Sequence, residues 1–323
     1  MLIDAYASLR HYAEHLAPVW AALPAELRGS FYSPSRTETW GQPLDRARDR
    51  GRLVLVASWR DAQTVGPSPL VYVEHGAGQS YDGDPRSAGN GSYSGGHALD
   101  RVRLFLCPNA DVAARWQARY PDATTAVVGC PKLDAWHTAA PWAERPLGRP
   151  TVAVTFHWEC PLVPETRSAW GHYDHHLPGL VADPRWQVLG HGHPRLWGAI
   201  RRRWRDLHAE HTPELADVLD RADLLVADNT SALYEFASTG RPVLVLNAPW
   251  YRRHVDHGLR FWSHPPGLQV DHPRDLVAGV AHALADPPAA RAIRARAVGR
   301  AYAHTDGHAA ERAATAIKEL HRA

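Results

Sequence analysis

Histidine, arginine and hydroxyl side chains follow several short apolar segments of this sequence. His75 ends the segment LVYVEH and is followed by Gly76. An imidazole titrates near neutral pH, so at the end of a strand it can take a proton from a substrate hydroxyl as a general base. A histidine before a glycine can also simply bond a neighbouring carbonyl group, and the residues here leave both interpretations open.

A second group of this kind follows the apolar segment WQVLG. It contains His191, His193 and Arg195 and stands directly before a predicted helix. Imidazole and guanidinium groups at a helix N-terminus favour an anion such as pyrophosphate, because that end carries partial positive charge. The two alternating histidines also have the spacing of metal ligands, but no third ligand stands at a diagnostic spacing. We therefore expect phosphate binding without a metal or other cofactor.

A third group follows the segment DLLVA. Asp228, Asn229, Thr230 and Ser231 form a polar corner before a predicted helix, and Glu235 lies about one turn into that helix. Thr230 or Ser231 would cap the helix, and free N–H groups and hydroxyls at such a corner can bind phosphate. Glu235 is placed to bind the diol of a ribose. Capping and a solvated glutamate explain the same residues, so this corner alone does not decide between the two.

The fourth group lies in the segment VVGCPKLD. Gly129 and Pro131 predict a tight turn, after which Lys132 and Asp134 could face a cleft. A surface ion pair is the simpler interpretation of these two residues.

The elements that must position these groups form the same pattern in both halves of the chain. Apolar runs such as LVLVAS and RLFLCP alternate with helical stretches, one of them opened by the cap residue Asn109. Runs that are apolar on both faces are typical of a parallel sheet covered on both sides. The proline-rich segment 139–150 separates the halves, and the pattern restarts with TVAVTF. We predict an α/β protein of two doubly wound, Rossmann-like domains, residues 1–145 and 146–323, the second with a helical tail. Ligands in such folds bind beyond the carboxyl ends of the strands, where all four groups stand.

Composition narrows the class of protein. The 323 residues carry a net charge of +2, which predicts no strong overall attraction to nucleic acid or membrane. No apolar run reaches the ~20 residues that a transmembrane helix needs, and the first residues lack the features of a signal peptide, so we expect a cytoplasmic location. Cys107, Cys130 and Cys160 are too few and too widely spaced for a disulfide framework, and we expect them to be reduced and buried.

One predicted helix concentrates positive charge. The segment 195–208 contains Arg201, Arg202 and Arg203 with Trp197 and Trp204 among its arginines. A solvated helix face packed through its tryptophans explains this pattern. A surface that docks an anionic acceptor or nucleic acid is the alternative.

Taken together, the motifs resemble a known family. EHG, GCPKLD, TFHWE, GHGHP and ADNTSALYEFASTGRPVLVL occur in the order found in the CDP-glycerol glycerophosphotransferase family of teichoic acid polymerases, over roughly residues 70–260. The last motif is also similar, more loosely, to UDP-N-acetylglucosamine 2-epimerases. The resemblance implies the GT-B architecture, in which two Rossmann-like domains face each other across a cleft and the second holds most of the nucleotide donor.

The resemblance also implies roles for individual residues. His75 corresponds to the base that deprotonates the acceptor hydroxyl, and His193 to a histidine that contacts the donor pyrophosphate. Thr230 and Ser231 correspond to phosphate-binding hydroxyl residues, and Glu235 to the carboxylate placed against the ribose.

Two departures from the family concern positive charge. Trp158 corresponds to the tryptophan of a Thr-Trp-Arg motif, but Glu159 stands where the family has arginine. The lysine that often follows His-Gly is absent from HGAGQSY. The acceptor and the transferred group are therefore open: glycerol phosphate by the resemblance, or a sugar in view of the lost cations.

The sequence thus leads to one main hypothesis and two alternatives. The main one is an inverting, metal-independent transferase that uses a nucleotide-activated donor, with His75 as base and with His193, Arg195, Thr230 and Ser231 stabilising the departing phosphate. A UDP-sugar epimerase or hydrolase is the first alternative. A glycosyltransferase that modifies hydroxylated DNA bases is the second.

Overall fold

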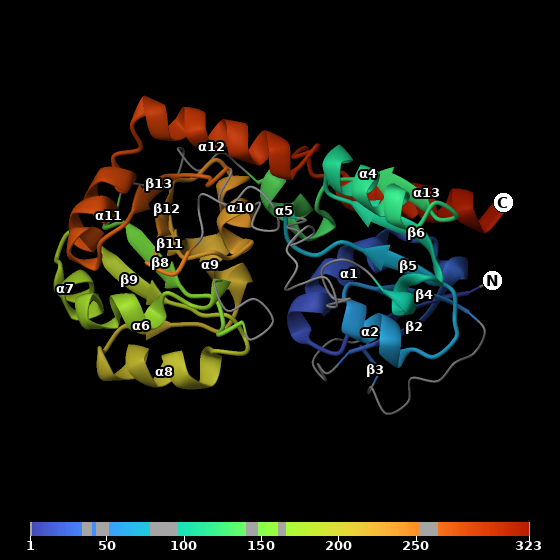
Figure 1. Cartoon of the computed structure of the whole chain (residues 1–323), viewed down its shortest axis with the longest axis horizontal. Helices are drawn as coiled ribbons and strands as arrows, with labels where there is room; N and C mark the ends of the chain where they lie inside the picture. The colour runs from blue at the N-terminus through green and yellow to red at the C-terminus, as the bar shows by residue number, and fades with distance from the viewer. Residues whose placement is uncertain are drawn as a thin grey trace. The chain divides into compact units, whose positions relative to one another are not determined.

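The computed structural model describes residues 2–33, 41–42, 52–77, 96–139, 148–160, 166–251 and 264–322. The composition of the stretch between His75 and Leu99, which is rich in Gly, Ser, Asn and Asp, predicts a mobile loop, and most of this stretch lies outside the described residues. The chain forms two compact units: unit 1 comprises Met1–Ala139 and Arg300–Ala323, and unit 2 comprises Ala140–Gly299. Each unit contains a sheet with helices packed on it (Figure 1).

Unit 1 is built on a parallel sheet with the strand order β3-β2-β1-β4-β5-β6-β7. Its strands are β1 (Ile3–Tyr6), β2 (Arg28–Tyr32), β3 (Gly41–Gln42), β4 (Leu53–Val56), β5 (Leu70–Val73), β6 (Val102–Cys107) and β7 (Thr124–Val127). The order runs outward from the pair β1 and β4, in which Ile3 lies opposite Leu53 and Ala5 opposite Leu55. In doubly wound sheets, ligands bind at the carboxyl ends of the strands where the order reverses. In unit 1 this switch point follows β1 and β4.

Helices cover both faces of this sheet. They are α1 (Arg10–Ala22), α2 (Trp59–Thr64), α4 (Ala110–Arg119), α5 (Asp134–His137) and α13 (Ala309–Arg322), with the 3-10 turns η1 (Ala25–Leu27), η3 (His97–Leu99) and η4 (Pro131–Leu133). Alternate strand residues point to opposite faces. Leu55 and Val73 share a core with α1 and α13, whereas Val56 and Phe105 share a core with α4. Trp116 of α4 stacks on Phe105 with 5.0 Å between the ring centroids.

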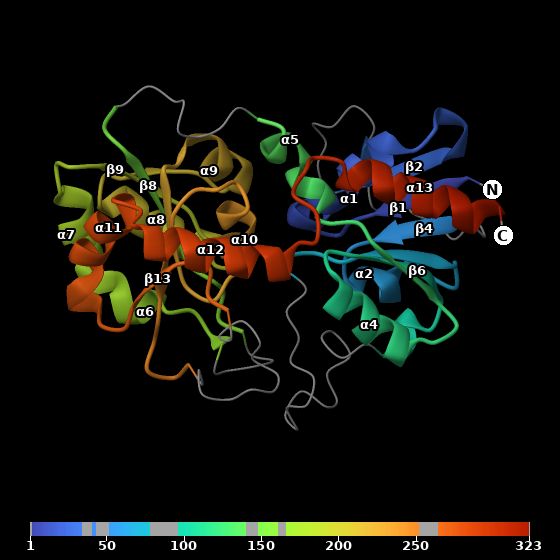
Figure 2. The ribbon, with the colours of Figure 1, turned by 90° about the horizontal axis from the view of Figure 1, so that it is seen from above.

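The final helix belongs to unit 1, although the sequence analysis placed residues 146–323 in the second domain. Ala313, Ala314 and Ile317 are buried in the same core as Leu16 of α1. Figure 2 shows α13 beside α1. Helical periodicity reveals that this helix is amphipathic, but the periodicity does not reveal which sheet its apolar face covers. The predicted domain division is therefore incorrect for the end of the chain.

Unit 2 is built on a second parallel sheet, with the order β10-β9-β8-β11-β12-β13. Its strands are β8 (Thr151–Thr155), β9 (Gln187–Gly190), β10 (Glu210–His211), β11 (Leu224–Ala227), β12 (Val243–Leu246) and β13 (Leu268–Val270). The order reverses between β8 and β11, where Val154 lies opposite Val226. The polar segments that follow these two strands therefore meet at one edge of the sheet.

Most helices of unit 2 are short. They are α6 (Trp170–Tyr173), α7 (Leu177–Ala182), α8 (Trp197–Asp206), α9 (Leu215–Arg221), α10 (Ala232–Ala237), α11 (Leu276–Leu284) and α12 (Pro288–Ala301), with η7 (Asp174–His176) and η9 (Pro273–Asp275). Trp204 of α8 is fully buried and lies directly over Gly190 at the end of β9, where no larger side chain fits. This contact fixes α8 close to the segment that carries His191 and His193.

The predicted α/β class with two doubly wound, Rossmann-like sheets is confirmed. Cys107, Cys130 and Cys160 are buried and form no disulfides, as predicted. Within the described ranges, none of the helices combines the length and the apolar character needed to cross a bilayer.

Candidate active site

His75 lies beyond the carboxyl end of β5, next to α1. Its half-buried ring meets Tyr12 edge-on at 5.1 Å between centroids and His15 at 6.2 Å. Gly76, the next residue, has φ 74°, a left-handed conformation that favours glycine. The glycine therefore lets the chain turn sharply directly after the imidazole.

The α1 side of His75 is buried and contains further titratable groups. His15 is 3% exposed, and its pKa is held well below the usual value, mainly by burial and then by the charges of Lys132 and His75. The Lys132 ammonium is also buried and lies 3.3 Å from the Glu14 carboxylate. Lys132, which follows β7 in the chain, thus faces α1 and is close enough to His15 for its charge to act on the imidazole.

Asp61 is the buried carboxylate at the switch point of unit 1. Ser58, which follows β4, caps α2 by accepting the Asp61 N–H at 3.0 Å. One Asp61 oxygen accepts the Ser8 N–H at 3.2 Å, so the carboxylate joins the segment after β1 to the helix after β4. Burial raises the pKa of Asp61, while its serine partners and His75 act in the opposite direction. A protonated His75 would therefore be stabilised by this carboxylate.

Asp134 serves unit 1 as a helix cap. Its carboxylate accepts the N–H groups of Ala309 and Ala310 at 3.0 and 2.8 Å, at the start of α13. It does not pair with Lys132, whose partner is Glu14. The predicted surface ion pair is therefore wrong, and capping explains Asp134 without a ligand.

In unit 2, the buried Asp228 side chain links two segments at the carboxyl edge of the sheet through hydrogen bonds. The side chain is fully buried, and its two oxygens accept the N–H groups of His157 at 2.7 Å and Ala169 at 2.8 Å. Burial raises the pKa of Asp228 to about 7, with a smaller contribution from the Glu159 charge. Asp228 was predicted as a cleft residue. Instead it ties the segment after β8 to the segment before α6.

Asn229 also forms a buried hydrogen bond in this region. It is 5% exposed, and its amide nitrogen donates to the Thr166 carbonyl at 2.6 Å. The pair Asp228 and Asn229 thus holds both ends of the stretch between β8 and α6.

An aromatic stack with an arginine forms the accessible part of this edge. The Trp158 ring lies 6.0 Å from the His193 ring in a stacked arrangement, and the His157 ring meets His193 at 5.4 Å. The exposed Arg195 guanidinium lies 4.3 Å from the centroid of Trp158. The backbone N–H of Arg195 also donates a hydrogen bond to Nδ1 of His193, at 3.2 Å. The stack holds a positive charge in place at the carboxyl end of the sheet.

The two histidines of GHGHP take different positions. His191 is 6% exposed, and its Nδ1 lies 2.6 Å from the Thr155 hydroxyl. Its carbonyl accepts the indole N–H of Trp204 at 3.2 Å. His191 therefore supports the site from inside, whereas His193 belongs to the stack. Across the described ranges, no group of three or more His, Cys, Asp or Glu residues is arranged to hold a metal ion.

Thr230, Ser231 and Glu235 lie where the sequence predicted a helix start. The Thr230 hydroxyl accepts the Ala232 N–H at 3.3 Å, whereas Ser231 occupies the N-cap position without a capping side-chain bond. Both residues are half-buried. Glu235 is 4% exposed. The phosphate and ribose contacts of these residues remain predictions.

The sequence motifs do not predict a place in the site for Tyr12, His15, Asp61 or His157. His11 and His15 stand one turn apart on the first helix after the first strand, and Ser58 precedes Asp61 by the capping distance. These spacings could have pointed to the cluster around His75. The proximity of His157 to His193 depends on the pairing of β8 with β9, which no local pattern indicates.

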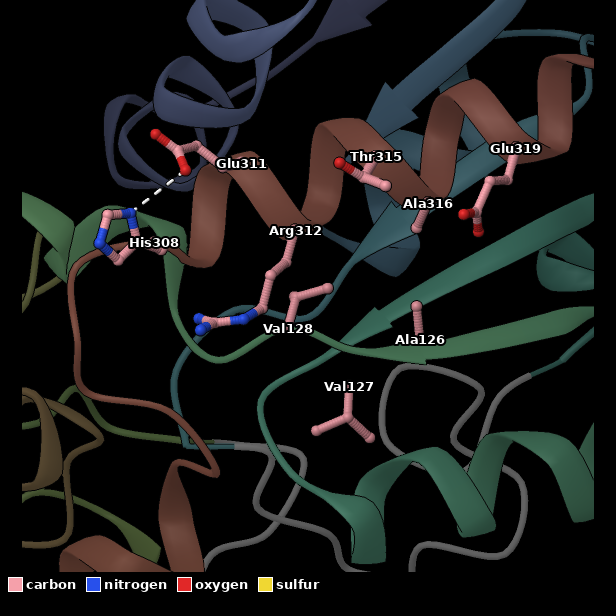
Figure 3. A pocket seen from close by; sticks show the side chains of 9 residues that line it. All are labelled: Ala126, Val127, Val128, His308, Glu311, Arg312, Thr315, Ala316 and Glu319. Carbon is pink, nitrogen blue, oxygen red and sulfur yellow. Dashed lines mark hydrogen bonds and ion pairs between the residues drawn. The ribbon is translucent and has the colours of Figure 1, made fainter.

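A separate shallow hollow lies along β7, one of the two edge strands of the unit 1 sheet. Its volume is about 430 Å³, and Figure 3 shows His308 and Glu311 paired at its rim. The lining residues are Ala126, Val127, Val128, His308, Glu311, Arg312, Thr315, Ala316 and Glu319. None of the predicted site residues is among them.

Two doubly wound units in one chain, each with a polar cluster at the carboxyl ends of its strands, are features of the GT-B fold. The family model of CDP-Glycerol:Poly(glycerophosphate) glycerophosphotransferase matches residues 182–319, which contain His193, Arg195 and the corner at Asp228. This match confirms the resemblance predicted from the motifs over residues 182–319.

Solved structures share the fold. An S. aureus MnaA–UDP complex matches with a TM-score of 0.66 at 14% identity, covering 100% of this chain and 97% of that chain. The wall teichoic acid polymerase TagF with CDPG matches with a TM-score of 0.63 at 10% identity, covering 99% of this chain and 88% of that chain. A UDP-GlcNAc 2-epimerase from Neisseria meningitidis bound to UDP-GlcNAc matches with a TM-score of 0.56 at 12% identity, covering 100% of both chains. At these identities the likeness shows the fold alone. No curated protein matches the sequence.

Proposed function

We propose that the protein transfers a group from a nucleotide-activated donor to an acceptor hydroxyl, by a single inverting displacement that needs no metal ion. The observation that carries this proposal is the stack of Trp158, His193 and Arg195 at the carboxyl edge of the unit 2 sheet. It places a fixed guanidinium at the switch point of a Rossmann-like sheet, which is the usual position of a nucleotide.

The donor phosphates are expected to bind Arg195 and His193. A guanidinium forms charge-assisted, often bidentate hydrogen bonds to phosphate, and the Trp158 ring limits the positions it can take. Thr230 and Ser231 would add hydroxyl donors, and Glu235 would bind the ribose after a small rearrangement. As the bond to the leaving nucleotide breaks, these groups stabilise the charge that develops on its phosphate.

The acceptor hydroxyl is expected to give its proton to His75. As its oxygen attacks the donor, the O–H bond breaks and the proton passes to the imidazole, while the electrons of the breaking donor bond leave with the nucleotide. Asp61 lies close enough to interact electrostatically with His75 and would stabilise the resulting imidazolium.

The transferred group is either glycerol phosphate or a sugar. Likeness to the family favours glycerol phosphate. The exposed Glu159 follows Trp158 at the position of the family's arginine, and its negative charge disfavours a second anionic group near the stack. A neutral sugar fits this charge better.

A thermal-shift panel tests the proposal. CDP-glycerol and UDP-, GDP-, CDP- and dTDP-sugars are added separately, because a ligand that binds only the folded state raises its melting temperature. We expect one donor class to stabilise the wild type and to stabilise Arg195→Ala much less. A panel without any such shift would contradict the proposal. Turnover of the binding donor without an acceptor would instead favour the epimerase or hydrolase alternative.

A second candidate function rests on the charged face of α8. Arg201, Arg202 and Arg205 are exposed, and within the described residues they form no ion pair or hydrogen bond, whereas Arg203 pairs with Asp174 at 2.8 Å. A glycosyltransferase that acts on hydroxylated DNA bases would use this face to bind phosphates.

The DNA alternative has its own test. Binding of duplex DNA is measured over a series of salt concentrations for the wild type, for the triple substitution of Arg201, Arg202 and Arg205 by Gln, and for the control Arg185→Gln. Affinity that falls steeply with salt and is lost only in the triple variant would support it. Absent or salt-insensitive binding would exclude it.

A further inference from the structure

His15 is a buried imidazole with a ring nitrogen that makes no hydrogen bond. The residue is 3% exposed, and its Nδ1 has no partner among the described atoms. An unsatisfied buried polar atom is unfavourable, and in folded proteins it calls for an explanation such as a catalytic role. The position of His15 offers one.

The ring of His15 contacts the proposed base. It meets His75 at 6.2 Å between centroids with 71° between the ring planes, and Tyr12, three residues earlier on α1, meets the same ring at 5.1 Å and 73°. Residues three apart share one face of a helix. The buried face of α1 therefore holds two rings against the imidazole of His75.

An ion pair between a buried lysine and a partly buried glutamate lies next to His15. The Lys132 ammonium and the Glu14 carboxylate are 3.3 Å apart, and the side chains are 6% and 27% exposed. The pair connects η4 to α1 at the residue next to His15. Burial, followed by the Lys132 charge, holds the pKa of His15 well below its usual value, so the ring is uncharged at neutral pH.

The titratable groups around His75 come from four segments. They are His11, Tyr12, Glu14 and His15 on α1, Asp61 on α2, Lys132 on η4, and Glu74 next to His75. Glu74 accepts the indole N–H of Trp116 at 2.6 Å. Among these groups, Lys132 carries a positive charge and interacts with His15.

We propose that His15 is a positioning residue for His75, and that the Lys132–Glu14 ion pair holds the part of α1 that carries His15 in place. The inference rests on the proposed function, which makes His75 the base. In the tautomer that carries its proton on Nε2, the Nδ1 of His15 offers a lone pair to the imidazolium that forms on His75. The neutral ring thus stabilises the protonated base without competing for the proton.

The first experiment replaces the His15 imidazole by a phenyl ring, which has no nitrogen atoms. His15→Phe should lower kcat by about tenfold, part of the contribution of a general base, and leave the KM of the donor unchanged. His15→Gln, which restores a polar atom, should recover part of the loss. The exposed His97→Phe is the matched control. A folded His15→Phe variant with wild-type kcat would overturn the proposal.

The second experiment needs no turnover. The His75 imidazole is followed by NMR in protein labelled with ¹⁵N-histidine, with its signal assigned by its loss in His75→Gln. Lys132→Met should raise the pKa of His75, because a nearby positive charge is removed and Glu14 is left unpaired. Lys132→Arg should keep the wild-type value, and Lys132→Met combined with Glu14→Gln should return toward it. Identical titrations in all these variants would overturn the proposed role of the ion pair, even if His15→Phe does not fold.

The outcomes separate this inference from the proposed function. If His75→Ala abolishes transfer while the His15 and Lys132 variants match the wild type, the proposed function stands and this inference fails. If His75→Ala retains transfer, the proposed function fails and His15 has no base to position.

Discussion

The two units of this protein share a sheet topology but hold their polar groups in opposite ways. At the edge of the unit 1 sheet, His15, Asp61 and Lys132 are buried around the half-buried His75. At the edge of the unit 2 sheet, the exposed Arg195 rests on Trp158 and His193, while Asp228 is buried beneath them.

This difference matches two kinds of chemistry. Burial and neighbouring charges shift proton affinities, which suits a group that must take up a proton. An exposed guanidinium keeps its charge and presents several donors, which suits a phosphate. Under the proposed function, the same fold would therefore hold a proton-transfer site in unit 1 and an anion site in unit 2, through the placement of a few side chains.

The largest expected effect comes from removing the base of unit 1. His75→Ala should lower kcat/KM by about 10²- to 10⁴-fold, because proton removal from the acceptor is lost. The shift in melting temperature caused by the donor should stay at the wild-type value, since donor binding is assigned to unit 2. His97→Ala serves as a control because its side chain is exposed. Unchanged turnover in folded His75→Ala would end the assignment of proton transfer to unit 1.

The buried carboxylate of unit 2 should give the protein a distinctive dependence on pH. The pKa of Asp228 is about 7 in the fold, well above the usual 3.8, so the folded state binds more protons than the unfolded state between these values. The free energy of unfolding should therefore fall as pH rises from about 4 to about 7, by about 4 kcal/mol at most. His157, whose pKa burial lowers to about 4, contributes the opposite slope.

The variant Asp228→Asn isolates this contribution. Reversible denaturant unfolding is measured at several pH values for both proteins, and the wild type should lose stability relative to the variant as pH rises. The His157 contribution is present in both proteins and cancels in the difference. Two parallel curves would show that Asp228 does not carry the raised pKa.

Substitutions at the proposed anion site of unit 2 should lower the affinity for the donor and leave proton transfer unchanged. Arg195→Ala should weaken donor binding by about 10- to 100-fold, because charge-assisted hydrogen bonds contribute about 1.5–3 kcal/mol each. Trp158→Ala should have a smaller effect, since it removes only the support of the guanidinium. Arg202→Ala, on the exposed face of α8, is the matched control for donor titrations. A variant Arg195→Ala with normal affinity but low kcat would contradict the division of roles between the units.

The smallest expected effect is the loss of stability when α13, the final helix, loses its cap in unit 1. Asp134→Ala removes the cap of α13 and should lower the free energy of unfolding by about 0.5–2 kcal/mol without changing donor affinity. Glu319→Ala, near the other end of the same helix, is the control. If Asp134→Ala instead loses activity but keeps the wild-type free energy of unfolding, Asp134 belongs to the active site.

Local patterns predicted much of the fold because buried parallel strands and amphipathic helices leave clear periodicities. The strands at 53–56, 70–73, 151–155 and 224–227 follow this rule. The two-residue strands β3 and β10 and the short helix α2 are too brief to show a period. The unit that α13 covers depends on contacts with α1, more than 280 residues earlier in the chain.

The amino-acid sequence alone indicates the class of fold, the likeness to glycerophosphotransferases and the positions of His75, His193 and Arg195 after strands. These properties follow from residue type and short-range spacing. The three-dimensional arrangement, in contrast, shows that Asp228 and Asp134 stabilise the fold by hydrogen bonds, that Lys132 pairs with Glu14, and that His15 lies against His75. The physical reason is that burial and electrostatic environment depend on which strand ends and helix faces come together, and residues far apart in the chain supply them.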